Sequence, residues 1–145
     1  MRQGRIVYNY FPIPGREPDS GKIINIYRPF IPIQILAGGK VSRPFYALVD
    51  SGSDRNLFPG AIMKILSLTA NQGKPKKISG IGNIKITART FNIEIKLLHS
   101  IPLIFETSAD FSSKQEIPLL GRDGFFSLFR SIEFRERRKL IELRT

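Results

Sequence analysis

Cysteine is absent from this 145-residue chain, and histidine occurs once, as His99. The absence of cysteine excludes a disulfide framework and any thiolate metal site. A single histidine excludes a histidine-rich zinc site and most histidine-based catalytic triads. Acid–base chemistry must therefore rest on carboxylates or lysines, and we expect neither a metal ion nor a cofactor.

Long hydrophobic runs are also missing. No apolar stretch approaches the ~18 residues that a membrane span requires, and residues 1–6 have no apolar core of signal-peptide length. We therefore expect a cytoplasmic protein with no membrane partner. With 145 residues, of which 41% are apolar, the chain has room for one compact domain but not for two.

The chain is strongly basic, with a formal net charge of +11, which raises the question of a nucleic-acid partner. The basic residues are dispersed, with small groups at 74–77 and 135–139, and no stretch interleaves them with aromatic residues that could stack on bases. A solvated basic surface explains this pattern better than a nucleic-acid site does. The positive field would still attract acidic peptides and other polyanions.

One acidic residue stands where an acid is unexpected. Residues 45–49 are aromatic, β-branched or aliphatic, which predicts a strand buried on both faces, and Asp50 follows this strand directly. Gly52 then permits a tight turn. Because burying a carboxylate costs several kcal/mol unless it has partners, Asp50 at this place favours a functional role.

The same Asp-Ser-Gly tripeptide occurs a second time, at residues 19–21. That copy follows a polar, turn-rich stretch that begins at Pro14, with no strand to hold a carboxylate still. We interpret Asp19 as part of an ordinary loop.

The segment from Leu48 to Asp54, Leu-Val-Asp-Ser-Gly-Ser-Asp, resembles the active-site loop of the retropepsin-like aspartic proteases. The resemblance implies that Asp50 is catalytic. Ser51, Gly52 and Ser53 would complete the active-site loop, with Ser51 bracing it against a second copy and the Gly52 carbonyl facing the substrate backbone.

A second motif is Lys77–Ile86, two β-rich runs around the tip formed by Gly80, Ile81 and Gly82. Composition alone favours a plain hairpin turn, because glycines are what the turn geometry demands. Its position after the Asp loop resembles the retropepsin flap, which implies a mobile hairpin that folds over bound peptide.

A third motif, Leu119-Leu120-Gly121-Arg122-Asp123, resembles the second family signature, in which an apolar pair and a glycine lead into a short helix. Taken alone it would be a strand running into a turn. The resemblance places Asp54 beside Arg122 within one subunit, so we expect a supporting ion pair between them, with both residues exposed as the alternative.

The rest of the chain reads as short strands. We expect a strand at 5–11, a break at 12–21, a β-meander leading to Asp50, strands at 90–98 and 101–106, and a final hairpin at 131–143. One short helix should follow Pro59 and another Gly121.

The fold prediction is an all-β, small closed acid-protease barrel of the retropepsin-like type, with a flap hairpin and one or two short helices. We expect residues 1–22 to form a partly irregular N-terminal extension and residues 23–145 to form the protease domain.

The resemblance implies an aspartic endopeptidase that hydrolyses peptide bonds. Since the chain supplies one Asp loop, two copies must pair about a twofold axis, so that a homodimer brings two Asp50 carboxylates to one water. Two alternatives stay open: a catalytically silent homodimeric module of the same fold, and a basic β-barrel that binds nucleic acid.

Overall fold

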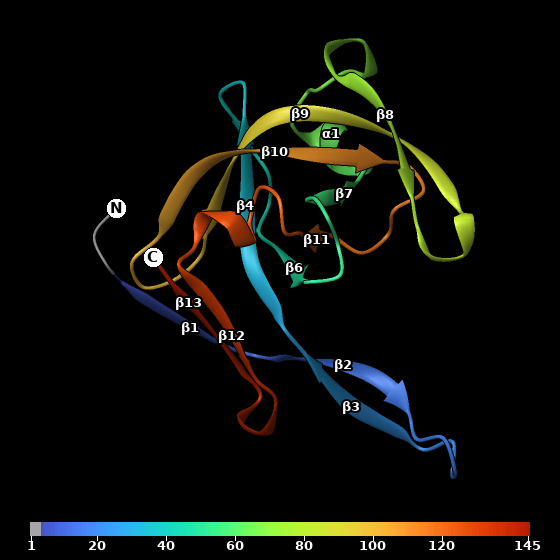
Figure 1. Cartoon of the computed structure of the whole chain (residues 1–145), viewed down its shortest axis with the longest axis vertical. Coiled ribbons are helices and arrows are strands. Elements are labelled where there is room, and N and C mark those ends of the chain that lie inside the picture. The colour runs from blue at the N-terminus through green and yellow to red at the C-terminus, as the bar shows by residue number, and fades with distance from the viewer. Residues whose placement is uncertain (1–3) are drawn as a thin grey trace.

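The computed structural model describes residues 4–145, and most of them lie in β-strands (Figure 1). The strands are β1 (Arg5–Asn9), β2 (Phe11–Arg16), β3 (Ile23–Arg28), β4 (Phe30–Ala37), β5 (Lys40–Val41), β6 (Phe45–Val49), β7 (Leu57–Pro59), β8 (Lys74–Ser79), β9 (Lys85–Leu97), β10 (Leu103–Ser112), β11 (Leu119–Leu120), β12 (Ser131–Arg135) and β13 (Leu140–Arg144). The helix α1 spans Ala61–Ile65, and 3₁₀ turns lie at Ala70–Gln72, Ile81–Asn83, Phe126–Leu128 and Glu136–Arg138.

Six strands form a closed, mixed β-barrel in the order β4, β6, β11, β7, β10 and β9. The pairing of β9 back onto β4 closes it, through the register Ile33 opposite Leu97 and Ile35 opposite Ile95. The contacts β6–β11 and β7–β10 are parallel, and the others are antiparallel. This closed all-β barrel is the predicted fold.

Alternation along the strands explains which side chains fill the barrel. In β4, Ile31, Ile33 and Ile35 are fully buried, and in β9 the residues from Phe91 to Leu97 bury every second side chain. A strand places successive side chains on opposite faces, so the β-branched and aromatic residues at alternate positions point inward. The strand predicted at 90–98 is therefore confirmed as the C-terminal part of β9.

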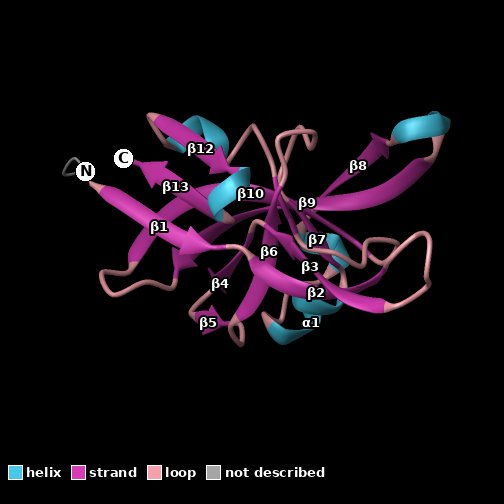
Figure 2. Ribbon diagram, turned by 90° about the horizontal axis from the view of Figure 1, so that it is seen from below, coloured by secondary structure: helices cyan, strands magenta, loops and turns pink. Residues whose placement is uncertain are grey.

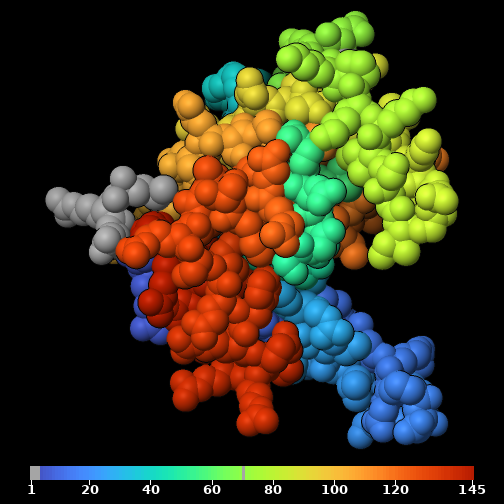
Figure 3. Space-filling model, viewed as in Figure 1, coloured from blue at the N-terminus to red at the C-terminus, as the bar shows by residue number. Residues whose placement is uncertain are grey.

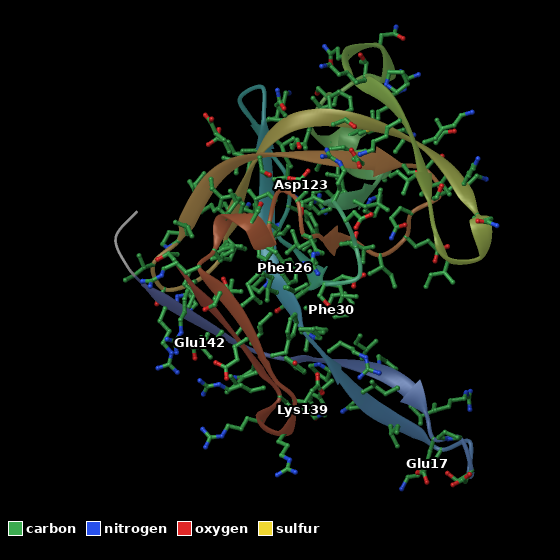
Figure 4. All side chains as sticks on the ribbon, viewed as in Figure 1. Glu17, Phe30, Asp123, Phe126, Lys139 and Glu142 are labelled. Atoms are coloured by element: carbon green, nitrogen blue, oxygen red, sulfur yellow. The ribbon has the colours of Figure 1, made fainter. Side chains whose placement is uncertain are left out.

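A separate sheet in the order β1, β13, β12 lies beside the barrel. The predicted hairpin at the C-terminal side is confirmed as β12 and β13, and Figure 4 shows Lys139 at its turn. β1 pairs with β13, from Arg5 opposite Arg144 to Asn9 opposite Leu140. The segment 5–9, which we assigned to an extension, thus contributes Ile6 and Tyr8 to the same core as the barrel.

The break predicted at 12–21 is wrong for its first half. Residues Phe11–Arg16 form β2, which pairs with β3 in a two-stranded ribbon that projects from the barrel (Figures 1 and 3). Pro12 and Pro14 are exposed, and their neighbours in the strand are exposed or half-buried. An edge strand tolerates proline because it need not donate every N–H. The actual turn is at 18–20 and contains Asp19, so the second Asp-Ser-Gly copy is confirmed as a loop.

The helix predicted after Pro59 is confirmed as α1, with Ile62 packed into the core. The helix predicted after Gly121 is reduced to the 3₁₀ turn at Phe126–Leu128. Gly124 has φ +97°, which an α-helix cannot contain, so the chain turns once before it can coil. No helix among residues 4–145 has the length and apolarity needed to cross a membrane.

Candidate active site

Asp50 directly follows β6, one of the six strands of the barrel. The strand lies between β4 and β11, with Ala47 and Val49 buried. The Val49 N–H donates to Pro29 O at 3.0 Å, and the Asp50 N–H donates to Leu120 O at 3.0 Å. Because both neighbouring strands hold the backbone, Asp50 starts its loop from a fixed position. The prediction that the strand is buried on both faces is wrong, since Tyr46 is 44% exposed and only the face of Ala47 and Val49 is buried.

The loop that follows also fixes the carboxylate. The Gly52 N–H donates to Asp50 Oδ1 at 2.9 Å, and the Ser53 N–H donates to the Asp50 carbonyl at 3.1 Å. A Cβ on Gly52 would lie 3.2 Å from Asp50 Oδ1, so a larger residue would crowd the carboxylate. The Ser53 hydroxyl donates to Arg55 O at 2.8 Å, and Ser51 is exposed. Asp50 is half-buried, with one oxygen anchored in its own turn.

Gly121, which directly follows β11, packs against the loop that contains Asp50. A Cβ on Gly121 would lie 2.3 Å from Arg55 O and 2.4 Å from Arg55 C, so only glycine allows the two backbones to cross. The Gly121 N–H donates to Asn56 Oδ1 at 3.0 Å, while Asn56 Nδ2 donates to Ser108 O and Gly124 O, both at 3.1 Å. Asn56 is fully buried and joins the active-site loop to β10 and to the segment after β11.

The ion pair expected between Asp54 and Arg122 does not form within the chain. Their segments do lie side by side, because the Asp123 N–H donates to Asp54 O at 2.8 Å, but both side chains are exposed. Among residues 4–145, the ion pairs at this place belong to Arg55, whose Nε lies 2.9 Å from Asp110 Oδ2 and whose Nη1 lies 3.2 Å from Asp123 Oδ2. The two segments meet as expected, but the predicted ion pair is wrong: the pair between them is Arg55 with Asp123, one residue further on in each segment and with the charges exchanged.

Asp110 is the centre of this network. Its side chain is only 1% exposed, and it accepts hydrogen bonds from Arg55 Nε at 2.9 Å, Arg55 Nη2 at 3.2 Å and Thr90 Oγ1 at 2.6 Å. Lys76 Nζ lies 3.6 Å from its Oδ2. Hydrogen bonding to Asp110 raises the pKa of the Arg55 guanidinium despite the opposing effect of burial. One buried carboxylate thus connects the active-site loop, β9 and β8.

The hairpin of β8 and β9 has the tip predicted for a flap. The Gly80 N–H donates to Ile84 O at 2.7 Å and closes the turn. Gly82 has φ +78°, which favours glycine, whereas Gly80 has φ −100° and a Cβ there would lie 3.7 Å from Ile84 O, an ordinary contact. Ile81 is 99% exposed. Figure 2 shows the hairpin extending to the side of the molecule opposite the chain termini.

A cleft of about 530 Å³ lies between the Asp50 loop and this hairpin. In Figure 3 the loop around residues 50–57 lies between the C-terminal part of the chain and the hairpin. The apolar residues that line the cleft are Leu57, Ile78, Ile81, Ile84, Ile86 and Leu119, and the charged ones are Asp50, Asp54, Arg55, Lys76, Lys77 and Asp110. A larger hollow of about 710 Å³ is lined by Glu94, Glu106 and Asp123 among others, but no residue of the Asp50 loop reaches it. The cleft beside Asp50 is therefore the candidate active site.

Sequence analysis missed three residues of this site: Arg55, Asn56 and Asp110. The signal for Asp110 was weak, because only Ala109 and Phe111 flank it and the residues beyond them, Ser108 and Ser112, are polar. Arg55 and Asn56 carry no comparable signal, since polar residues after a turn are ordinary. Among residues 4–145 no group of three or more histidine, cysteine, aspartate or glutamate side chains could hold a metal ion.

Comparison with known proteins supports the fold. No protein-family model matches the chain, and no curated protein matches it. Among solved structures, the chain is similar to the crystal structure of a retropepsin-like aspartic protease from Rickettsia conorii, with a TM-score of 0.58 and 13% sequence identity, over 99% of this chain and 92% of that one. The chain therefore has the retropepsin-like β-barrel fold.

Proposed function

We propose that the protein is an aspartic endopeptidase whose active site forms between two copies of the chain. One observation carries the proposal: the Asp50 carboxylate is held at the end of a buried strand by the Gly52 N–H, inside a cleft that a glycine-tipped hairpin borders. The similarity in fold to a retropepsin-like aspartic protease supports it.

The chemistry requires two carboxylates that face one water molecule. Two such charges at close range cannot both ionise, so they share one proton. The ionised carboxylate takes a proton from the water, which attacks the carbonyl carbon of the peptide, while the protonated carboxyl donates a hydrogen bond to the carbonyl oxygen. The carboxyl group that took the proton from the water then passes it to the leaving amine as the tetrahedral intermediate collapses and the C–N bond breaks.

One chain offers a poor second carboxylate. Asp110 lines the same cleft, but its oxygens are occupied by Arg55 and Thr90. Asp54 lies on the same loop as Asp50, with its backbone carbonyl fixed by the Asp123 N–H. A twofold axis next to the loop would instead bring Asp50 of a second copy to the same water. In that arrangement the exposed Ser51 hydroxyl braces one loop against the other.

The test compares two substitutions of aspartate by asparagine. Asp50→Asn should abolish hydrolysis of a peptide library, read by mass spectrometry, while the melting temperature stays unchanged, because the base is lost but the shape of the side chain remains. Asp19→Asn is the matched control in the second Asp-Ser-Gly copy and should leave turnover unchanged. A pepstatin-type inhibitor should block the wild-type enzyme.

Specific activity should also fall on dilution as dimers dissociate. Near-wild-type turnover by Asp50→Asn, or full activity in a strict monomer, would contradict the proposal. A stable dimer without hydrolysis would favour a silent module, and salt-dependent binding to arbitrary RNA or DNA without hydrolysis would favour a nucleic-acid barrel.

A further inference from the structure

The two faces of the flap hairpin differ in character. Lys76 and Ile78 on β8 lie opposite Ala88 and Ile86 on β9, and these four side chains share one face. That face is turned toward the barrel, since Ala88 is buried and Lys76, Ile78 and Ile86 are half-buried. Lys85 precedes Ile86 on β9, points to the other, exposed face and is not among the residues that line the cleft.

Among residues 4–145, the Lys76 ammonium makes only one long ion pair, with Asp110. The carboxylate of Asp110 already accepts three hydrogen bonds from Arg55 and Thr90. Lys76 Nζ stays 3.6 Å from Asp110 Oδ2, beyond hydrogen-bond range, and its side chain is 37% exposed. Arg55 contacts both Asp110 and Asp123, whereas Lys76 has, within the part of the chain that the structure describes, only its long ion pair with Asp110, so Lys76 is the more weakly held cation at this end of the cleft.

We propose that Lys76 determines substrate specificity by pairing with an acidic side chain of the bound peptide. This inference rests on the proposed peptidase function. Ile78 and Ile86 line the cleft nearer to the hairpin tip, and Lys76 lies two residues from Ile78, which is about 6.7 Å along an extended strand. An extended peptide would therefore place an apolar side chain at Ile78 and an acidic one two positions away, at Lys76.

The acidic groups that line the cleft restrict the preference for an acidic side chain to the position opposite Lys76. Asp50 and Asp54 belong to the loop on the floor, whereas Lys76 belongs to the flap. An acidic residue would thus be favoured opposite Lys76 and disfavoured directly over Asp50. In a twofold dimer the second copy repeats Lys76 at the other end of the cleft, so the preferred peptide has acids on both sides of an apolar centre.

The experiment uses two peptides that differ only by glutamate or glutamine, at the position two residues from the apolar one in a sequence that the enzyme cleaves. At about pH 6, where a glutamate with a pKa of about 4.3 is ionised, the wild-type kcat/KM should favour the glutamate peptide about fivefold, as for a half-exposed ion pair. Lys76→Gln should reduce the ratio to about one. Lys85→Gln removes the same charge from the opposite face of the hairpin, outside the cleft, and should leave the ratio unchanged.

Binding provides a second measurement that does not need turnover. Fluorescence polarisation of both labelled peptides with Asp50→Asn should show the same preference, which should largely vanish near 1 M salt, where the Debye length is about 3 Å. Equal cleavage and equal binding of the two peptides by wild-type protein would overturn this inference and leave the peptidase proposal standing. Failure to cleave any peptide would overturn both, and an equal loss of preference in Lys76→Gln and Lys85→Gln would overturn this inference, because only net charge would then act.

Discussion

Replacing Asp110 with asparagine should destabilise the protein by about 3 kcal/mol. The carboxylate is 1% exposed and pairs with Arg55 through Nε at 2.9 Å and Nη2 at 3.2 Å. Asparagine keeps the shape and can still accept from Thr90 and Arg55 Nη2 at the Oδ1 position, but its NH₂ group would face Arg55 Nε and Lys76 Nζ. Breaking a buried pair costs about 3–5 kcal/mol, and the lower end applies because Arg55 keeps its contact with Asp123.

The matched control is Asp123→Asn, which removes the other carboxylate partner of Arg55. Asp123 is 74% exposed and lies 3.2 Å from Nη1, so its loss should cost less than about 1 kcal/mol. Urea unfolding at fixed protein concentration measures both variants. For a chain of this size, 3 kcal/mol corresponds to a fall in melting temperature of roughly 6–12 °C.

A double-mutant cycle with Arg55→Met completes the measurement. Since each single change removes the same pair, the double variant should be more stable than the sum of the two losses predicts, by at least about 1.5 kcal/mol. Additive losses, or an Asp110→Asn variant no less stable than Asp123→Asn, would refute the claim that this pair holds the loop to β10.

Two further predictions concern backbone crossing and pH. Gly121→Ala should prevent folding or lower the melting temperature by more than 10 °C, roughly the effect of 3–5 kcal/mol, because its Cβ would lie 2.3 Å from Arg55 O. In the same thermal melt Gly80→Ala should change the melting temperature little, because its Cβ would have no neighbour closer than 3.7 Å among the described residues. Burial raises the pKa of Glu142, but the arginines around it, Arg144 and Arg5, outweigh burial and hold the pKa below its usual value. A carboxyl with a lowered folded-state pKa stabilises the fold above its unfolded pKa of about 4.5, and that stability is lost as pH falls through the lower folded value. As the pH is lowered below about 4.5, the urea concentration at the unfolding midpoint should therefore decrease. Glu142→Gln should weaken this pH dependence. An unchanged profile in this variant would count against the arginine cluster.

Local pattern predicted the barrel well because its strands carry their own signal. The isoleucines of β4 and the alternation in β9 identify buried faces without knowledge of the partner strands. The strand β2 was missed because Pro12 and Pro14 read as breakers, whereas a ribbon edge can accept them. The prediction of a helix after Gly121 was wrong because the positive φ of Gly124 is a property of the packed loop.

The site was predictable where one residue conflicts with its surroundings. Asp50 at the end of an apolar strand is such a conflict, and the structure places it in the cleft with Gly80, Ile81 and the loop residues Gly52 and Ser53. An ion pair between distant segments depends instead on tertiary geometry. Asp54 and Arg55 are neighbours in sequence, and only the positions of β10 and the turn after β11 decide which of them meets an opposite charge.

The pairing of β1 with β13 has a consequence for the order of events during synthesis. Ile6 and Tyr8 bury their side chains in a core that Ile141 and Leu143 complete, about 135 residues later in the chain. At about 5–20 residues per second, a ribosome needs roughly 7–27 s to deliver the partner strand. Through that interval the apolar face of β1 has no sheet to join, so a nascent chain must keep it from other chains until β13 emerges.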